Sequence, residues 1–394
     1  MIQFPIYLDN NATTPMDQRV LETIMPFFTK YFGNTASRTH AFGWEADAAV
    51  EYAREQVAHL VNAEPKEIVF TSGATEADNL ALKGVFEMYR SKGNHIITVK
   101  TEHKAVLDSC KHLEKMGAEI TYLDVREDGL IDVKELENAV RPDTILISVM
   151  YANNETGIIH PVKEIAAIAK KNSVLFFSDA TQAVGKIPVD VIKDGIDLMS
   201  FSAHKMYGPK GAGALYVRRK NPRVRIASQI DGGGHERGMR SGTLNVPAIA
   251  GFGRACELCL IEMKKDSERM CKLRDKLENE LLKSGGAFIN GSRQHRLPNV
   301  SNMSFKNVNS VDLLSALSKN IALSSGSACT SGTNEPSYVL KAMGLSDEMA
   351  LSSLRFGLGR FTTEEEIDYA AGQIINLIQQ SSRNITGMHK RFFK

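Results

Sequence analysis

One lysine stands where a reactive amine can be expected. Lys205 follows the apolar run 198–201 and precedes a glycine-rich turn, so the pattern predicts a lysine at the end of a strand. Ser202 and His204 add a hydroxyl and an imidazole beside it. When burial or a nearby cation lowers the pKa of such a lysine, its amine can attack a carbonyl and form an imine. Most lysines next to glycine-rich turns are solvated, so this segment alone does not decide whether Lys205 is catalytic.

One of the five cysteines has a context that the others lack. Cys329 lies in the segment 323–337, which is rich in glycine and serine and has no apolar periodicity, a pattern typical of an exposed loop. In its thiolate form such a cysteine can act as a nucleophile. Cys256 and Cys259 fall on one face of a helical pattern and are interpreted as buried, because the partners for a metal or redox site are absent.

Strands and helices alternate in the region that must position these groups. Apolar runs typical of buried strands alternate with helical patterns, which predicts an α/β fold with a largely parallel sheet covered by helices on both faces. Longer helical patterns cover 43–62 and 247–282. Ligands of such sheets bind at the carboxyl ends of the strands, so we expect polar residues that directly follow strands to lie close together. These residues are His103, Asn154, Asp179, Gln182, Ser202, His204 and Lys205.

The turn at 71–78 predicts an anion site. A strand ends there and a helix starts at about Ala74 and Thr75, so free N–H groups and hydroxyls face the start of the helix. Helix capping alone explains the hydroxyls about equally well. A second glycine-rich segment, 232–243, carries cations and ends at Thr243. It is either a flexible loop or a further phosphate contact supplied by a second subunit.

These residue types suit pyridoxal phosphate. That cofactor is held on a lysine as an imine and needs an acid at its ring nitrogen, a phosphate site and a group over its ring. Asp179 is the candidate acid, and His103 can cover the ring and move protons. Asn154 and Gln182 can contact the ring oxygen. Arg355 is a candidate for a substrate carboxylate, and the alternative is a surface ion pair. The candidates for the phosphate are Thr75, Ser202 and His204.

The composition excludes several other classes of protein. The 394 residues are 43% hydrophobic, and the net charge of +2 comes without a basic stripe, so nucleic acid is not expected as a direct ligand. No stretch resembles a membrane span, and residues 1–5 do not resemble an export signal, so we expect a cytoplasmic protein without membrane contact. The odd number of cysteines argues against a disulfide framework.

Seven segments together resemble the cysteine desulfurases, and the resemblance extends over nearly the entire chain. The segments are TSGATEADN, YANNETG, SDATQAVGK, SFSAHKMYGPKGAGALYVR, HERGMRSGT, SSGSACTSG and LRFGLGRFTTEEEID. The long cysteine segment is similar to the housekeeping class, which supplies sulfur for iron–sulfur cluster assembly. Two positions depart from the family pattern: Ala203 stands where glycine is common, and Thr35 follows Asn34 where proline is common.

The resemblance implies a fold-type I pyridoxal phosphate enzyme that forms a homodimer. It implies a mostly parallel seven-stranded sheet in a large cofactor domain, residues 17–260, and a smaller α+β domain of residues 1–16 with 261–394, which carries the cysteine loop at about 323–337. The catalytic residues would be Cys329, Lys205 and His103. The implied cofactor contacts are Ala74, Thr75, His103, Asn154, Asp179, Gln182, Ser202, His204, Lys205 and, across the dimer, Thr243. The implied substrate contacts are Arg355 and Asn34.

The implied reaction converts L-cysteine to L-alanine and leaves the sulfur on Cys329 as a persulfide. The persulfide would serve an iron–sulfur scaffold protein and other sulfur acceptors, with tRNA thiolation as a further use. Cys329 is also a candidate ligand of a transient [2Fe-2S] cluster shared with the scaffold. Two alternatives stay open. A selenocysteine lyase or small-substrate aminotransferase would keep Lys205 and Asp179 without needing the thiol, and a non-catalytic scaffold protein would only retain the fold.

Overall fold

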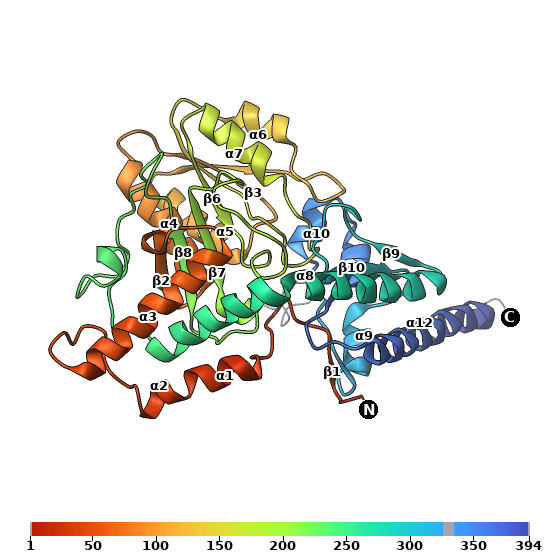
Figure 1. Ribbon diagram of the computed structural model, residues 1–394. Coiled ribbons are helices and arrows are strands. Elements are labelled where there is room, and N and C mark those ends of the chain that lie inside the picture. The colour runs from red at the N-terminus through yellow and green to blue at the C-terminus, as the bar shows by residue number, and fades with distance from the viewer. Residues whose placement is uncertain (1, 326–334, 393–394) are drawn as a thin grey trace.

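A seven-stranded sheet forms the centre of the larger part of the protein (Figure 1). The computed structural model describes residues 2–325 and 335–392, with side chains up to residue 380, so Cys329 lies outside the described residues. The strand order is β2-β8-β7-β6-β5-β3-β4, and only β8 runs antiparallel to its neighbours. The strands are β2 (Ile68–Thr71), β3 (His95–Val99), β4 (Glu119–Leu123), β5 (Thr144–Ser148), β6 (Leu175–Asp179), β7 (Leu198–Ser202) and β8 (Gly213–Val217).

Helices cover both faces of this sheet, because successive strand residues point to opposite sides and both sides are apolar. In β3, Ile96 packs on one face and Ile97 on the other, and Phe177 and Phe176 of β6 divide in the same way. The first face is covered by α4 (Ala74–Tyr89) and α5 (Lys104–Lys115). The second is covered by α3 (Ala41–Leu60), α6 (Val133–Ala139), α7 (Val162–Lys171) and the first half of α8 (Val246–Lys283). The predicted sheet and its two helical layers are therefore confirmed.

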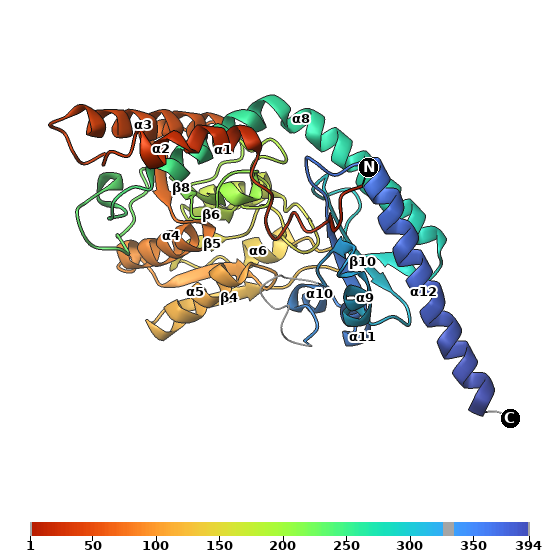
Figure 2. The ribbon, with the colours of Figure 1, turned by 90° about the horizontal axis from the view of Figure 1, so that it is seen from below.

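The smaller part has its own sheets and its own core (Figure 2). An antiparallel sheet has the order β12-β10-β9, and β1 pairs in parallel with β11. Because Ile6 and Leu8 belong to this core, the start of the chain joins its C-terminal part. The elements are β1 (Ile6–Tyr7), β9 (Ala287–Ile289), β10 (Val300–Phe305), α9 (Ser310–Leu317), β11 (Ile321–Ala322), α10 (Tyr338–Ala342), α11 (Asp347–Leu351), β12 (Ser353–Gly357) and α12 (Glu364–Phe392).

The 38-residue helix α8 connects the two cores. Its first half contributes Phe252 and Cys256 to the core of the large sheet, and its second half contributes Leu273 and Leu277 to the small core. We therefore propose a domain boundary near residue 260, inside α8, which is the boundary that the resemblance implies. The remaining elements are α1 (Gln18–Ile24), α2 (Pro26–Thr29) and three 3₁₀ turns, η1 (Pro65–Glu67), η2 (Ala203–Lys205) and η3 (Glu236–Gly238). Among the described residues, no helix is long and apolar enough to cross a membrane.

Candidate active site

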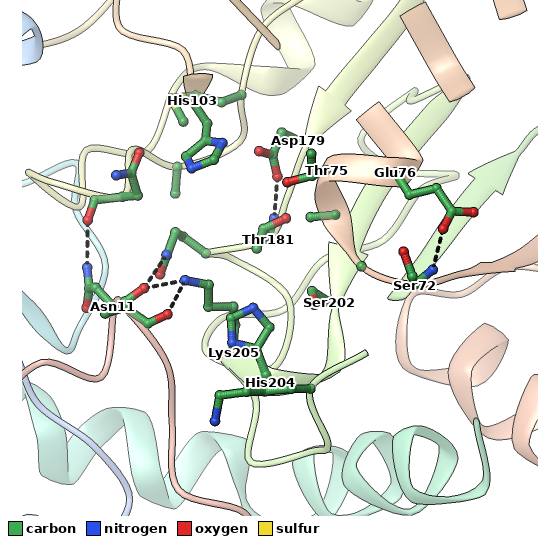
Figure 3. A pocket seen from close by; sticks show the side chains of 18 of the residues that line it. Asn11, Ser72, Thr75, Glu76, His103, Asp179, Thr181, Ser202, His204 and Lys205 are labelled. Carbon is green, nitrogen blue, oxygen red and sulfur yellow. Dashed lines mark hydrogen bonds between the residues drawn. The ribbon is translucent and has the colours of Figure 1, made fainter. Parts of the chain in front are cut away.

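A cavity of about 440 Å³ lies where the strands of the large sheet end (Figure 3). Its walls come from the β2–α4 turn, from the segments that follow β3, β5, β6 and β7, and from β12 of the smaller part. Parallel strands bring their carboxyl ends to one edge, which is why residues distant in sequence meet here. The predicted residues that line the cavity are Ala74, Thr75, His103, Asn154, Asp179, Gln182, Ser202, His204, Lys205 and Arg355.

Lys205 ends the 3₁₀ turn η2 directly after β7, as predicted. Its Nζ donates to the backbone oxygens of Asn11 and Ala12, at 2.6 and 2.7 Å, so the N-terminal segment fixes the amine at the cavity wall. The departure at Ala203 is accommodated by Gly208, since a Cβ at position 208 would lie 2.9 Å from the Ala203 Cβ. Ala203 is fully buried and does not line the cavity.

His103 is the N-cap residue of α5 and lies at the cavity wall. Its Nδ1 accepts from the backbone N–H of Ala105 at 3.2 Å. Burial lowers the pKa of His103, and the positive charge of Lys205 acts in the same direction, while the negative charge of Asp179 opposes part of the shift. The imidazole is therefore neutral at pH 7, and because Nδ1 is an acceptor, the ring proton is on Nε2.

The start of α4 has the properties of an anion site. Its N-cap is Gly73, at φ 158°, and no side chain caps the helix. Gly213 is required opposite this turn, because a Cβ there would lie 2.6 Å from the Gly73 Cα. Glu76 in the first turn is paired with Arg240 at 2.8 Å, which compensates a carboxylate that would otherwise repel an anion. Capping of this helix by its hydroxyls, the alternative interpretation, is thus absent, and Ala74 and Thr75 at its start line the cavity.

Several buried polar atoms at the cavity have no hydrogen-bond partner among the described residues. Buried polar groups are nearly always paired in folded proteins, so such atoms indicate a bound polar ligand or water. Asp179 differs, since its Oδ1 accepts from the backbone N–H of Thr181 at 2.9 Å. The unpartnered atoms are Asn11 Oδ1, Asn154 Oδ1, Thr181 Oγ1 and Arg355 Nε.

Arg355 of β12 is only 1% exposed, so it does not form the surface ion pair that was the alternative reading. Its Nη2 pairs with Asp9 at 2.8 Å, and its Nη1 donates to the backbone oxygen of Asn154 at 3.2 Å. These contacts leave Nε without a partner among the described residues, and Nε shares one edge of the guanidinium with Nη2. That edge is the fork that binds a carboxylate with two parallel hydrogen bonds.

The described residues at the two ends of the cysteine segment contact the cavity region. Upstream, the Ser324 carbonyl accepts from the backbone N–H of Arg355 at 2.7 Å. Downstream, Ser337 Oγ donates to Glu155 Oε2 at 2.5 Å, and Tyr338 Oη donates to the Glu102 carbonyl at 2.7 Å. The two ends of the segment are therefore attached next to Arg355, Asn154 and His103. Among the other cysteines, Cys256 and Cys259 are buried, as predicted.

A family model described as "Aminotransferase class-V" matches residues 6–370. This chain belongs to the class-V aminotransferase family. It is 57% identical over 380 residues to the cysteine desulfurase IscS of Anaeromyxobacter sp. (strain Fw109-5), covering 96% of this chain and 94% of that protein. It is 56% identical over 379 residues to the cysteine desulfurase IscS of Proteus mirabilis (strain HI4320), covering 96% and 93%.

Solved structures of this family have the same fold. A NifS-like protein superposes with a TM-score of 0.88 at 41% identity, covering 95% of this chain and all of that one. SspA in complex with cysteine superposes with a TM-score of 0.79 at 36% identity, covering 91% of this chain and all of that one. The fold-type I expectation is thereby confirmed.

Pyridoxal phosphate is the cofactor that this family membership implies, and the residues present fit it. The uncapped start of α4 suits a phosphate, Lys205 suits the aldehyde, and the Asp179 carboxylate suits the ring nitrogen. The unpartnered amide oxygen of Asn154 and hydroxyl of Thr181 are further groups that a polar ligand would satisfy.

Two predicted residues lie outside the cavity of this chain. Asn34 is exposed in the loop before α3, and its Oδ1 accepts from the backbone N–H of Ala36 at 2.9 Å, so the side chain shapes its own turn. Thr243 is also exposed and lines a separate hollow with Ser72 and Arg240. Asn34 therefore does not line the cavity of its own chain, and its contact with substrate stays a prediction, as does the contact of Thr243 across a dimer.

The N-terminal turn is the part of the site that sequence reasoning missed. Asn11 and Ala12 line the cavity, and Thr13 Oγ1 lies 3.1 Å from His204 Nδ1. This polar turn does not cap the helix that follows it, because the N-cap of α1 is Asp17. The only local signal was the pair of adjacent asparagines, because the contacts with Lys205 join residues 194 and 193 positions apart.

Two further carboxyl groups are buried behind Asp179. Asp78 Oδ1 accepts from Ser200 Oγ at 2.5 Å, and Glu102 Oε1 accepts from the backbone N–H of Met150 at 2.5 Å. Burial raises the pKa of both carboxyls well above the ordinary range, and the negative charge of Asp179 raises them further. Burial therefore favours the neutral form of both groups, which makes them weaker competitors of Asp179 for a cationic ring nitrogen.

Proposed function

We propose that this protein is a pyridoxal phosphate-dependent cysteine desulfurase, which converts L-cysteine to L-alanine and moves the sulfur to an enzyme cysteine. The observation that carries the proposal is the identity of 56–57% to curated cysteine desulfurases over nearly the whole chain. The cavity adds support, because it joins a lysine, a neutral histidine, a carboxylate and a buried arginine fork.

The roles of the residues follow from their chemistry. Arg355 binds the substrate carboxylate through its Nε edge and so orients the amino acid in the cavity. Bound to Lys205, pyridoxal phosphate supplies an electron sink for the bonds around the substrate carbon. Asp179 holds the proton of the ring nitrogen, and the start of α4 with Thr75, Ser202 and His204 holds the phosphate.

Proton transfer is assigned to two groups. Lys205 Nζ, once released, takes and returns protons at the substrate carbon. His103, which is neutral with its proton on Nε2, exchanges a proton at the opposite wall of the cavity. Asn154 and Gln182 line the same cavity and would contact the ring oxygen of the cofactor.

Cys329 is proposed as the sulfur acceptor. Its thiolate attacks the substrate sulfur, so the C–S bond of L-cysteine breaks and an S–S bond to Cys329 forms. The substrate carbon gains a proton, and the products are L-alanine and a persulfide on the enzyme, so atoms and electrons balance without another reactant. The role rests on the sequence, since Cys329 lies outside the described residues.

The predicted partners extend the proposal. A homodimer is supported by exposed apolar side chains around α2 and the start of α3, which a second copy would cover. These side chains are Met25, Phe28, Phe32, Phe42 and Trp44. An iron–sulfur scaffold protein and other sulfur acceptors are proposed as partners, and the likeness to cysteine desulfurases named IscS supports this. The cytoplasmic location and the shared [2Fe-2S] cluster at Cys329 stay predictions.

A single-turnover reaction with L-cysteine tests the function. The holoenzyme is expected to release one alanine per active site and to gain one sulfur atom in intact mass. Cys329→Ser should keep the cofactor but gain no sulfur, whereas the matched control Cys271→Ser, a half-buried cysteine of α8, should behave as the unaltered protein.

Three other results would contradict the proposal. Alanine release without any persulfide would favour the selenocysteine lyase alternative. Bound cofactor with no release of alanine from cysteine would favour a small-substrate aminotransferase. Failure to bind the cofactor at all would leave a non-catalytic scaffold protein.

A further inference from the structure

A second lysine lies behind the cavity wall, and the roles assigned above do not use it. Lys186 is 3% exposed and belongs to the turn that follows β6. Among residues 2–325 and 335–380 it forms no ion pair. Its Nζ donates instead to the backbone oxygen of Gln182 at 3.1 Å and to the side-chain Oε1 of Gln182 at 3.0 Å. Burying an amine without a carboxylate partner costs free energy of folding, so the position of Lys186 calls for an explanation.

The contacts of Lys186 determine which end of the Gln182 amide faces which neighbour. Oε1 accepts from Lys186, and Nε2 donates to the backbone oxygen of Asn11 at 3.0 Å. Turning the amide over would place its oxygen against the Asn11 carbonyl and its nitrogen against the amine. The contact with the Asn11 carbonyl would then be repulsive in either protonation state of Lys186, and the contact with a protonated amine would be repulsive as well. The two neighbours therefore select one orientation. An amide nitrogen has two protons, and the second one stays available to the cavity that Gln182 lines.

The same carbonyl links this arrangement to the reactive lysine. Asn11 O accepts from Gln182 Nε2 and also from Lys205 Nζ at 2.6 Å. A continuous series of hydrogen bonds therefore runs from Lys186 through Gln182 and Asn11 to Lys205. Lys186 itself does not line the cavity.

Tight packing keeps Lys186 in this position. Its backbone oxygen accepts a hydrogen bond from Ser267 of α8. The preceding residue, Gly185, has φ 79°, and a Cβ there would lie 2.6 Å from Met206 Cε and 3.0 Å from Cys259 Sγ. The turn is thus fixed between α8 and the residue that follows Lys205, and the amine has one direction in which to point.

We propose that Lys186 is a positioning residue that holds the Gln182 amide with its nitrogen toward Asn11 and the cavity, where it donates to an anionic oxygen of the bound cofactor. The proposal rests on the proposed function. Burial, with the charge of Lys205, lowers the pKa of Lys186 to about 7. Either protonation state has at least two N–H groups for the two oxygens, so the amide stays oriented on both sides of that pKa.

A double-mutant cycle on the holoenzyme tests this inference without substrate. The variants are Lys186→Met, Gln182→Ala and both together, and the readouts are the dissociation constant of pyridoxal phosphate and its visible absorbance band. Lys186→Met should weaken cofactor binding roughly tenfold, the loss expected for one hydrogen bond to a charged oxygen, and should shift the band. In the Gln182→Ala background the same change should have less than about a twofold effect, because Lys186 acts through Gln182.

The matched control is Lys193→Met. Lys193 is close to Lys186 in the sequence but is exposed, so this substitution should change neither the dissociation constant nor the absorbance band. Additive effects in the cycle, or unaltered binding and spectrum in Lys186→Met, would overturn the inference. If Lys186→Met does not fold, Lys186→Gln, which has a shorter side chain, takes its place in the cycle with the same expectations. An unaltered protein that binds no cofactor, or that releases no alanine from L-cysteine, would refute the proposed function rather than the role of Lys186.

Discussion

Replacing Arg355 by lysine tests how the substrate is bound. The change retains the positive charge beside Asp9 but removes the planar fork that Nε and Nη2 form. A hydrogen bond to a charged group is worth about 1.5–3 kcal/mol, and lysine can replace one bond of the two. The expected loss is therefore about 1.5–3 kcal/mol, or roughly a 12- to 150-fold decrease in kcat/KM for L-cysteine.

The assay is steady-state alanine release over a range of L-cysteine concentrations. Most of the loss should be a rise in KM, and the visible absorbance of the bound cofactor should not change, because Arg355 contacts substrate rather than cofactor in the proposed site. The matched control is Arg360→Lys, at an arginine that is also buried but pairs with Asp17 and Asp266 and does not line the cavity.

Arg360→Lys should lower the free energy of unfolding and leave KM within about twofold of the unaltered value. A KM for Arg355→Lys that equals that of the unaltered protein would refute the assignment of Arg355. Equal losses of kcat/KM in the two variants would refute it as well, because the effect would then be one of stability and not of substrate binding.

Three further predictions concern the lysine, the acid and a buried histidine. Lys205→Ala should abolish the visible absorbance of lysine-bound cofactor while the apoprotein unfolds near the unaltered temperature, as spectroscopy and thermal unfolding would show. Asp179→Asn should bind cofactor but lower kcat by roughly a hundredfold or more, since an amide cannot hold the ring proton by charge; single-turnover kinetics measure this, and a kcat within tenfold would contradict the role. His160 is fully buried with a pKa lowered to about 4, so the unfolded chain takes up its proton first as pH falls below about 6.5. The free energy of unfolding should decrease by about 3 kcal/mol between pH 6.5 and 4 because of His160. His160→Leu should remove that part of the pH dependence, which urea unfolding at pH 7, 5.5 and 4 would measure. The same pH dependence in the variant and in the unaltered protein would contradict the lowered pKa of His160.

The periodicity of apolar residues and the position of the turn residues were enough to predict the fold. Ile96 and Ile97 lie in an apolar run because each face of their strand packs against a layer of helices. A strand that is buried on both faces has consecutive apolar residues, and a short stretch of sequence is enough to show them. The glycine-rich turn after Lys205 likewise marks a strand end, where a parallel sheet gathers its ligand-binding residues. The sequence by itself therefore determined the α/β architecture, the candidate lysine and half of the residues that line the cavity.

The contacts between segments distant in sequence were decided only by the tertiary structure. The carbonyls of Asn11 and Ala12 hold Lys205 across more than 190 positions, and Asp9 pairs with Arg355 across 346. No local pattern encodes such partners, because they depend on how the N-terminal segment packs against the small core and over the strand ends. Lys186 illustrates the same limit: its sequence context marks it as an ordinary polar residue in a turn, and only burial against α8 directs its amine to Gln182.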